Sequence, residues 1–594
     1  MGEKLTAVFN NKIWIRITGI AFPVVLFLFA MLHIGEGMPA TDTGYNYGNF
    51  RFFDGLDDMW KFSTYLANVV GAFFTKLPFG ETMLGMNFYT GLFKALAALV
   101  TYFLCVRVCK MSRGLVFFAQ MLALGFCWCP TALLYNYMTY FLFTLGALFV
   151  FQAFKAEKSR YLVLAGVCLG LNVMVRLPNV AEAALIVCVW FGGIVYKKEF
   201  KKILQDTLWC MLGYLGSVGV IFLYIVVRYG LHAYVEGIQA LFAMTENATS
   251  YSTMSMLLDS FRMYLAYSKW VMLLAGIMAC GIIGFAVFKG KFLLLKKIGV
   301  AAAVGGYVFI AYLKGMYTLN YRNYTSMFFW GVLFLIIALF LCAYATFFAK
   351  CGRELKLLAS MAAVIIFITP IGSNNHLYSP MNNLFLVAPV VFSVIRHLLY
   401  EQKRVMIGDR VEISTYPIAA MLVGLVSVVL LQSVCFGASF VFRDGTEGEK
   451  RVYKVENNAV LAGMRTTEQN AENLQGLNDY LTGQALIGER VLLYGNVPSL
   501  AFYFSLEPAI SSTWPDLESF SHEKFTEEID LLETQDLPIV ITDAVTYDSL
   551  LMYDDATYGE SNGEKKLEHL QAFLKDNGYC ESYRNAGFVV YKSE

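Results

Sequence analysis

Long runs of apolar residues, separated by short polar segments, fill the first three quarters of this chain. A helix that crosses a bilayer needs about 20 consecutive and mainly apolar residues, and by that rule the pattern predicts about 13 membrane-spanning helices. They fall at 14–33, 83–106, 114–129, 137–154, 161–176, 180–196, 204–227, 264–288, 298–313, 325–349, 357–371, 382–397 and 416–437. The pattern therefore predicts a polytopic α-helical membrane protein.

Lysine and arginine gather in alternate loops between these runs, which sets the predicted orientation. The basic loops contain Arg107/Lys110/Arg113, Lys155/Lys158/Arg160, Lys197/Lys198/Lys201/Lys202, Lys289/Lys291/Lys296/Lys297, Lys350/Arg353/Lys356 and Lys403/Arg404/Arg410. Cytoplasmic loops carry the excess of Lys and Arg, and the N-terminal Lys4, Lys12 and Arg16 fall on the same side. The N-terminus is predicted to be cytoplasmic and the segment after the last span extracytoplasmic. One merged or missed span would reverse the second prediction.

The composition changes sharply at the end of the last span. Residues 437–594 contain 27 acidic and 12 basic residues, a net charge of −15, while the rest of the chain carries +16, so the total of +1 hides a split. Short apolar strands at 491–494, 538–542 and 587–592 alternate with helical patterns at 450–480, 499–506, 526–534 and 564–577. This alternation predicts a small α/β domain with a mostly parallel sheet. The domains are therefore 1–437, transmembrane, and 438–594, extracytoplasmic.

Composition excludes several classes of protein. Only 15% of the 594 residues are charged and 57% are hydrophobic, whereas a soluble domain carries about 25% charged residues. A soluble enzyme, a disordered chain and a coiled coil are excluded, and a nucleic acid partner is not expected. Most of the 12 cysteines lie in or beside spans, where Cys behaves as a small apolar residue. No His–Cys metal centre is predicted.

The first outer loop, 34–82, differs from every other loop. Residues 39–50 read PATDTGYNYGNF, so Asp42 follows the first span closely and its polar neighbours, Asn46 among them, add no charge. Such a carboxylate suits a general base that takes a proton from a hydroxyl. The alternative is a solvated turn in which Asp42 caps its own backbone. Residues 58–76 predict an amphipathic helix on the membrane surface.

Arg176 ends the fifth span on the outer side, where positive charge is otherwise avoided. An Arg there commonly faces a cavity or an anion, and its planar fork suits a phosphate. The alternative is an Arg that snorkels to the interface. Polar and aromatic clusters lie on the same side of the membrane, at Tyr135-Asn136-Tyr137 and at Gly372-Ser373-Asn374-Asn375-His376.

This arrangement resembles the GT-C superfamily of polyprenyl-phosphate-dependent glycosyltransferases, and most of all the bacterial relatives of protein O-mannosyltransferases and lipid A aminoarabinose transferases. The resemblance covers nearly the whole chain. It depends on the Asp in a long first outer loop with surface helices, on the Gly-Leu-x-x-x-x-Arg-x-Pro end of the fifth span (170–178), and on the C-terminal outer α/β domain with its strand and turn at 492–498.

The resemblance implies an inverting sugar transfer from a polyprenyl phosphate, whose lipid tail lies in a groove between spans. Asp42 would deprotonate or orient an acceptor hydroxyl. Arg176, with Arg51, Lys314 or Arg322, would stabilise the departing lipid phosphate. The polar side chains of Asn46, Tyr137, Asn374 and Asn375 are further candidates for substrate binding. The acceptor, a glycan, lipid or protein of the cell envelope, is left open. So is a divalent metal, because Asp42 lacks the adjacent second acidic residue of several members.

Three other functions remain as alternatives. A transporter would favour internal repeats, an even span count and charges at mid-membrane. A polysaccharide polymerase or ligase would carry its large soluble part in an internal loop. A non-catalytic assembly protein would use its outer domain to bind envelope polymer. The charges that collect at one outer surface, and the lack of a detected repeat, favour the glycosyltransferase.

Overall fold

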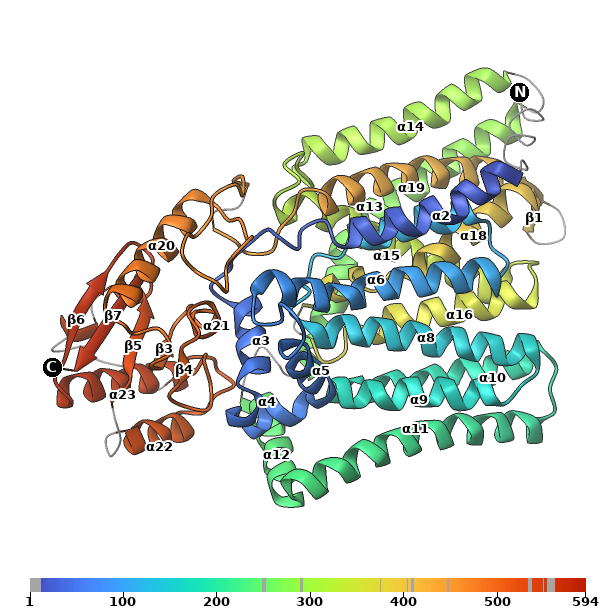
Figure 1. Ribbon diagram of the computed structural model, residues 1–594. Coiled ribbons are helices and arrows are strands. Elements are labelled where there is room, and N and C mark those ends of the chain that lie inside the picture. The colour runs from blue at the N-terminus through green and yellow to red at the C-terminus, as the bar shows by residue number, and fades with distance from the viewer. Residues whose placement is uncertain are drawn as a thin grey trace.

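The computed structural model describes residues 12–247, 253–288, 292–373, 375–402, 404–407, 411–445, 448–532, 537–548, 550–552 and 561–593. A bundle of helices runs side by side, and the C-terminal domain stands at one end of it (Figure 1). The first helix of the bundle, α2 (Lys12–Ala30), begins at the opposite end and runs toward that domain.

A helix occupies most of each of the predicted membrane spans. After α2 come α6 (Met83–Arg107), α7 (Arg113–Gly125), α8 (Leu134–Ala156), α9 (Arg160–Val175), η2 (Leu177–Leu185) with α10 (Ile186–Val195), α11 (Phe200–Tyr229), α13 (Thr253–Val287), α14 (Leu293–Leu313), α15 (Phe328–Ala343) between η4 (Tyr324–Ser326) and η5 (Tyr344–Phe348), α16 (Arg353–Ile368), α18 (Val387–Tyr400) and α19 (Tyr416–Gly437). Among the described residues, 8 helical stretches are long and apolar enough to cross a membrane. The chain is a polytopic membrane protein, while the exact span count and the orientation stay predictions.

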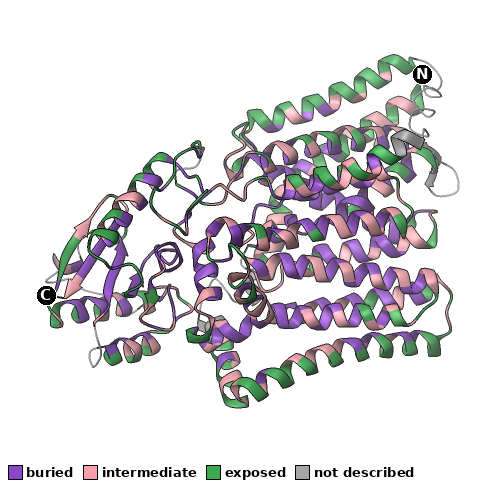
Figure 2. Cartoon of the chain, in the orientation of Figure 1, coloured by how far each residue is buried: buried purple, intermediate pink, exposed green. Residues whose placement is uncertain are grey.

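The helices at the margin of the bundle expose apolar side chains. Figure 2 shows long exposed stretches on α11 and α14, and the exposed side chains include Leu212, Leu223, Val227 and Leu294. Such a surface would be unstable in water, because burying a Leu or Val side chain is worth about 1.5–3 kcal/mol. These faces fit contact with lipid.

The first outer loop folds into short helices between the bundle and the C-terminal domain (Figure 1). They are α3 (Asp42–Arg51), η1 (Phe53–Gly55), α4 (Asp58–Ser63) and α5 (Tyr65–Thr75). The amphipathic helix predicted at 58–76 is therefore divided at Thr64, and α12 (Leu231–Asn247) packs against α4. Asp42 begins a helix whose next eight residues are buried, so it does not lie in a solvated turn.

The C-terminal domain holds a sheet in the order β4-β3-β5-β7-β6. Its elements are α20 (Glu468–Gly483), β3 (Arg490–Tyr494), α21 (Leu500–Tyr503), β4 (Glu507–Pro508), α22 (His522–Leu532), β5 (Ile539–Asp543), η6 (Leu550–Met552), α23 (Asn562–Asp576), β6 (Tyr579–Arg584) and β7 (Phe588–Ser593). The sheet is mixed: β4, β3 and β5 are parallel, whereas β7 is antiparallel to β5 and β6. The mostly parallel sheet predicted from the sequence is therefore wrong in part. Strand β6 is polar and largely exposed, so it has no run of apolar residues from which its antiparallel hairpin with β7 could be predicted.

Two smaller elements complete the described structure, the hairpin of β1 (Arg404–Ile407) with β2 (Val411–Ser414) and the short helix α17 (Tyr378–Met381). The C-terminal domain and the first outer loop share one hydrophobic core. Tyr47 of α3 packs on Phe502 of α21 with 5.4 Å between ring centroids. The domain therefore fixes the position of α3.

Candidate active site

Asp42 stands at the first turn of α3, with 28% of its side chain exposed. One carboxylate oxygen lies 3.7 Å from Arg443 Nη1 and accepts a weak hydrogen bond from Thr41 Oγ1 at 3.4 Å. Burial raises the pKa of Asp42, and the charge of Arg443 opposes that shift. A carboxylate with a raised pKa is a stronger base than an exposed Asp.

The backbone before Asp42 is held by the C-terminal domain. The Ser499 hydroxyl lies 2.8 Å from the carbonyl oxygen of Pro39 and 2.7 Å from that of Thr41, and its proton can serve either. The Ser499 amide donates to Ala40 at 3.0 Å, and Tyr503 OH donates to Pro39 at 2.7 Å. Both side chains are fully buried. The turn that follows β3 and the end of α21 therefore form hydrogen bonds with the backbone of residues 39–41, which lead into Asp42.

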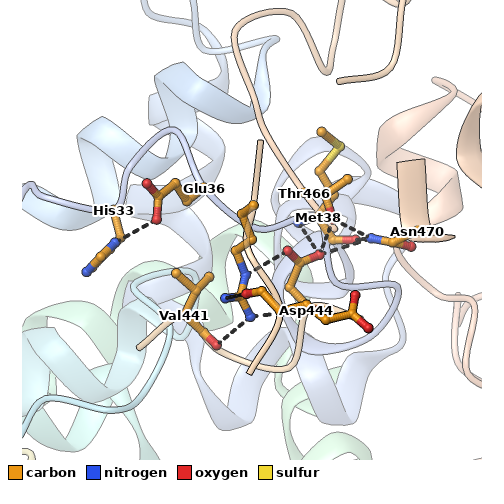
Figure 3. A network of polar contacts seen from close by, with 9 residues as sticks. His33, Glu36, Met38, Val441, Asp444, Thr466 and Asn470 are labelled. Carbon is orange, nitrogen blue, oxygen red and sulfur yellow. Dashed lines mark hydrogen bonds and ion pairs between the residues drawn. The ribbon is translucent and has the colours of Figure 1, made fainter. Parts of the chain in front are cut away.

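A buried carboxylate, Asp444, binds the same segment at Met38, the residue before Pro39 (Figure 3). It accepts hydrogen bonds from the Met38 amide at 2.9 Å, Thr466 Oγ1 at 2.5 Å and Asn470 Nδ2 at 3.0 Å. Its other oxygen accepts from Arg451 Nε at 2.9 Å. This network joins the end of the last span to the first outer loop and to the C-terminal domain.

Four helices of the bundle are too short to cross a bilayer core of about 30 Å at 1.5 Å per residue. They are α7, α9, α16 and α18, with 13, 16, 16 and 14 residues. The irregular segments that adjoin them meet at the end that carries the C-terminal domain and line one cavity. Non-helical backbone at membrane depth is tolerated where it lines such a cavity.

This cavity, the Arg176 cavity, is polar. Its lining includes Arg176, Asn179, Glu182, Thr369, Ser373 and Asn382, together with Trp128 and Tyr140. Glu182 is buried and accepts a hydrogen bond from Asn172, while Asn179 Nδ2 donates to Thr139 Oγ1 at 2.7 Å. Amides, hydroxyls and aromatic rings form its wall, and groups of these kinds can bind the hydroxyls and the apolar ring face of a sugar. The space between them is about 20 Å³, which is room for about one water.

Arg176 is oriented by two contacts in this cavity. Its guanidinium donates to the carbonyl oxygen of Gly372 and lies 5.7 Å from the Tyr135 ring centroid. Gly372 has a φ of +78°, and a Cβ there would lie 2.3 Å from the Pro178 ring. A glycine is thus needed for the backbone to approach Arg176.

The loop that follows α7 lies between the surroundings of Arg176 and those of Asp42. Trp128 and Cys129 of this loop line the Arg176 cavity and also a second cavity, which is lined by Pro39 and Thr43 on either side of Asp42 in the chain. Arg176 and the segment that carries Asp42 therefore contribute to neighbouring cavities.

Two other cavities lie in the same bundle. The Lys94 cavity, of about 100 Å³, shares Trp128 and Cys129 with the Arg176 cavity and is also lined by His33, Glu36, Asn87 and Lys94. The apolar cavity, of about 690 Å³, lies among α10, α13, α15 and α16 and is lined by Val187, Phe191, Phe340, Val364 and Phe367.

The other predicted residues fall in different places. Asn375 lines the Arg176 cavity, and Asn46 donates to the backbone carbonyl of Asp42 at 2.7 Å. Tyr137 is buried, and its hydroxyl donates to the carbonyl oxygen of Cys129 at 2.6 Å, so it stabilises the loop that follows α7. Asn374 lies outside the described residues.

Three predicted cations lie away from the cavities. Arg51, at the other end of α3 from Asp42, packs near Phe52 and Phe502. Lys314 caps the end of α14 on the surface. Arg322 contacts the carbonyl oxygen of Gly448 at 3.5 Å. None of the three lines the Arg176 or Lys94 cavity as described.

Sequence analysis did not single out Glu182, Lys94 or Arg443. Glu182 and Lys94 are charged residues inside predicted spans, and that position is itself a signal of function. Arg443 gave no such signal, because it follows the last span in a polar segment and reaches Asp42 only through the fold.

The residues beside Asp42 do not fit a divalent cation. Its charged neighbour is Arg443, and in the described ranges no three His, Cys, Asp or Glu side chains cluster closely enough to hold a metal ion. A hard cation such as Mg²⁺ prefers several oxygen ligands.

No protein-family model matches this chain, and no curated protein matches it. The fold is similar to solved structures of three other proteins. The oligosaccharyltransferase of Archaeoglobus fulgidus is 13% identical, with a TM-score of 0.44 over 99% of this chain and 75% of that one. ArnT from Cupriavidus metallidurans bound to undecaprenyl phosphate is 12% identical, with a TM-score of 0.41 over 97% of each chain.

The third is the arabinosyltransferase EmbB of Mycobacterium smegmatis, which is 15% identical, with a TM-score of 0.31 over 70% of this chain and 41% of that one. All three are members of the GT-C superfamily, the class that the sequence resembles. At TM-scores this low the alignments assign no roles to residues of this chain.

Proposed function

We propose that this chain is an inverting glycosyltransferase that moves a sugar from a polyprenyl phosphate to an acceptor hydroxyl on the outer face of the membrane. One observation carries the proposal. An oriented guanidinium, Arg176, lines a polar cavity that shares Trp128 and Cys129 with the cavity lined by Pro39 and Thr43, the neighbours in sequence of the partly buried carboxylate Asp42.

In the proposed reaction Asp42 accepts the proton of the acceptor hydroxyl. The hydroxyl oxygen forms a bond to the anomeric carbon as the bond from that carbon to the phosphate oxygen breaks. Attack opposite the leaving group inverts the anomeric configuration. The products are the glycosylated acceptor and polyprenyl phosphate, and the proton on Asp42 passes to solvent. A positioned base of this kind contributes about 10²–10⁴-fold to the rate.

Arg176 stabilises the negative charge that develops on the departing phosphate. Its guanidinium presents a planar fork that matches two phosphate oxygens. Asn179, Glu182 and Asn382 line the same cavity, and we propose that they contact the sugar in exchange for their present hydrogen bonds within the protein. Arg51, Lys314 and Arg322 have no role in this proposal, because they lie away from that cavity.

The apolar cavity is proposed to take the polyprenyl chain. The end of α16 lines this cavity through Phe367 and the Arg176 cavity through the next residue, Ile368, while η2 lines the Arg176 cavity and α10, which follows η2, lines the apolar one. Phe191, Phe340 and Phe367 line it, and no charged residue appears among its described lining. A lipid whose phosphate meets Arg176 can therefore extend its chain into the bilayer.

The proposal includes an orientation. The end of the bundle with the C-terminal domain is taken as extracytoplasmic, because the basic loops, such as Lys197 to Lys202 between α10 and α11, lie at the other end. A reporter fused at Glu594 is expected to signal outside, and one fused near Lys201 inside. A cytoplasmic signal from Glu594 would contradict the proposal.

The direct test uses the purified chain in nanodiscs with a labelled polyprenyl-phosphate sugar and an envelope lipid extract. Wild-type protein is expected to transfer label to an acceptor and release polyprenyl phosphate. Cells that lack the gene are expected to accumulate the lipid-linked sugar. A chain that neither consumes the donor in vitro nor changes its level in cells would not be this transferase.

A further inference from the structure

Two tryptophans contact Tyr45, the buried residue that follows Asp42 by about one turn of α3. Trp60 belongs to α4, and its ring centroid lies 6.3 Å from that of Tyr45 at an interplanar angle of 88°. Trp514 belongs to the segment between β4 and α22 of the C-terminal domain, and its ring lies 5.5 Å from Tyr45 at 73°. Residues three apart in a helix are neighbours on its surface. The aromatic cluster therefore adjoins the face of α3 that carries Asp42.

The protein covers neither tryptophan completely. Both side chains are half-buried. Among the described residues, the hydrogen bonds of Trp60 and Trp514 use their backbone atoms, and neither indole N–H has a partner. A tryptophan N–H usually finds a hydrogen-bond partner when it is buried. Two partly exposed rings with unused donors therefore suit contact with a ligand.

A buried lysine fixes the segment that carries Trp514. Lys566 of α23 is fully buried. Its ammonium donates to three backbone carbonyl oxygens of this segment, those of Pro515 at 2.6 Å, Leu517 at 2.8 Å and Phe520 at 2.9 Å. A lysine has three donors, so all of them serve this irregular stretch of backbone. The ring of Trp514 is thus presented from a rigid support.

The same segment is joined to the start of α4, which carries the other tryptophan. Asp57, the residue that caps α4, donates its amide to the carbonyl oxygen of Ser511 at 3.1 Å and forms an ion pair with Lys524. Ser511 in turn donates to Glu528 through its amide at 2.7 Å and its hydroxyl at 2.6 Å. The relative position of the two rings is therefore set before a ligand binds, which lowers the entropic cost of binding.

The chemistry of this surface favours a saccharide. The charges of Asp57 and Lys524 are paired with each other. The Asp516 carboxylate, two residues after Trp514, accepts a hydrogen bond from the Gly495 amide at 3.1 Å, and a carboxylate also accepts from hydroxyls. A sugar offers an apolar ring face to the indole rings and hydroxyls to the N–H groups and the carboxylate. A lipid chain would leave these polar groups without partners.

We propose that Trp60 and Trp514 bind a sugar residue of the acceptor, so that the acceptor is a glycan. This inference rests on the proposed function, in which Asp42 takes the proton of an acceptor hydroxyl. One residue of the glycan presents that hydroxyl to Asp42, and a neighbouring residue stacks on the indole rings. The C-terminal domain thereby contributes Trp514 to acceptor binding, in addition to its contacts with α3.

The test measures binding to the full-length protein in nanodiscs, without a sugar donor. The probes are short oligosaccharides released by mild acid from the cell envelope and, separately, tryptic peptides of the same envelope. Trp514→Leu and Trp60→Leu keep an apolar side chain but remove the aromatic face and the indole N–H. Each is expected to weaken oligosaccharide binding about tenfold, the scale of one lost aromatic contact. Trp514→Phe, which keeps a ring, is expected to weaken it less.

Trp209→Leu is the matched control, since Trp209 lies on the membrane helix α11 with 37% of its surface exposed. It is expected to leave the affinity unchanged. Unfolding temperatures are compared for all variants. Trp60→Leu carries the test if Trp514→Leu does not fold, because Trp60 lies on a separate element.

Four outcomes would overturn the assignment: no oligosaccharide binding by the wild type, unchanged affinity in both Trp60→Leu and Trp514→Leu, the same loss in Trp209→Leu, or binding of the peptides in place of the oligosaccharides. The measurement needs no sugar transfer. Oligosaccharide binding that depends on the two tryptophans, in a chain that transfers no sugar, would refute only the proposed function and leave the saccharide site in place.

Discussion

Ser499, in the turn after the first strand of the C-terminal sheet, lies 2.7 Å from the carbonyl oxygen of Thr41, the residue before Asp42. The two residues are 458 positions apart in sequence. The C-terminal domain therefore contacts the segment that leads into α3. It sets the place at which α3 begins, and with it the position of the proposed base.

Gly44→Ala is expected to lower activity by displacing α3 from the C-terminal domain. A Cβ at Gly44 would lie 2.4 Å from Ser499 Cβ, a separation that real structures do not show. Because a misplacement of about 1 Å can cost about 100-fold in rate, kcat is expected to fall well below wild type while donor binding persists. Initial rates in nanodiscs measure the change.

Gly48→Ala supplies the matched control, one turn further along the same helix. A Cβ there meets nothing within 4 Å, and Ala favours a helix over Gly by about 1 kcal/mol. Wild-type or better activity is expected. If both variants behaved alike, the contact with Ser499 would not position Asp42.

Asp42→Asn is expected to reduce transfer by about 100-fold or more, because the amide keeps the shape of the side chain but accepts no proton. Binding of the lipid donor should persist. Asp54→Asn is the control, since Asp54 is exposed in the same loop. Asp57 is unsuitable, because it caps α4 and forms an ion pair with Lys524 of the C-terminal domain. Equal rates for Asp42→Asn and wild type would exclude Asp42 as the base.

The pH dependence of kcat/KM is expected to report the burial of Asp42. Burial raises the pKa of Asp42. As the pH falls, Asp42 should therefore become protonated, and activity should be lost, at a pH above the pKa of about 3.9 of an ordinary Asp. Arg443→Met removes the charge that opposes this shift, so the acid limb should move to still higher pH. Arg322→Met is the control, because the Arg322 side chain contacts a backbone carbonyl, and it should leave the acid limb unchanged. An acid limb that moved down in Arg443→Met would contradict the assignment.

Hydrophobic runs predicted the bundle well, because a bilayer imposes a length and a composition on each span. The runs at 114–129, 161–176, 357–371 and 382–397 are already short in the sequence. They could not predict that the segments beside α7, α9, α16 and α18 line one cavity, since that depends on how the helices pack. The sequence of α3, DTGYNYGNFR, contains two Gly and two Asn and has low helix propensity. Its helix depends on burial against α21, which no local pattern reveals.

The candidate site likewise contains some residues that the sequence indicates and others that only the folded structure brings together. Asp42 and Arg176 could be proposed from sequence because each is a charged residue close to the end of a predicted span, on the side predicted to be outer. The hydrogen bonds of Ser499 and Tyr503 to residues 39–41, and the ion pair of Arg443 with Asp42, join segments about 400 or more residues apart. Sequence periodicity carries no information about such pairs.

Asp444→Ala is expected to destabilise the protein by about 3–5 kcal/mol, because it leaves the buried Arg451 guanidinium without its carboxylate. Thermal unfolding in detergent measures this. Asp444→Leu combined with Arg451→Met should recover much of the loss, since an apolar pair leaves no buried charge. Glu449→Ala, an exposed acid nearby, should have little effect. An unchanged unfolding temperature in Asp444→Ala would show that the network is not a stabilising element.

Arg176→Lys is expected to impair transfer strongly, by about tenfold or more, although the charge is kept. A lysine ammonium cannot present two parallel donors to a phosphate, and it cannot reproduce both the hydrogen bond to Gly372 and the contact with Tyr135. The loss should appear in kcat, because the charge on the leaving phosphate develops in the transition state. Arg322→Lys is the matched control, with its guanidinium outside the cavity. Expression and unfolding temperature should match wild type in both. If Arg176→Lys and Arg176→Gln both turned over donor at the wild-type rate, Arg176 would be an interfacial arginine that snorkels to water, and the leaving phosphate would need a different cation.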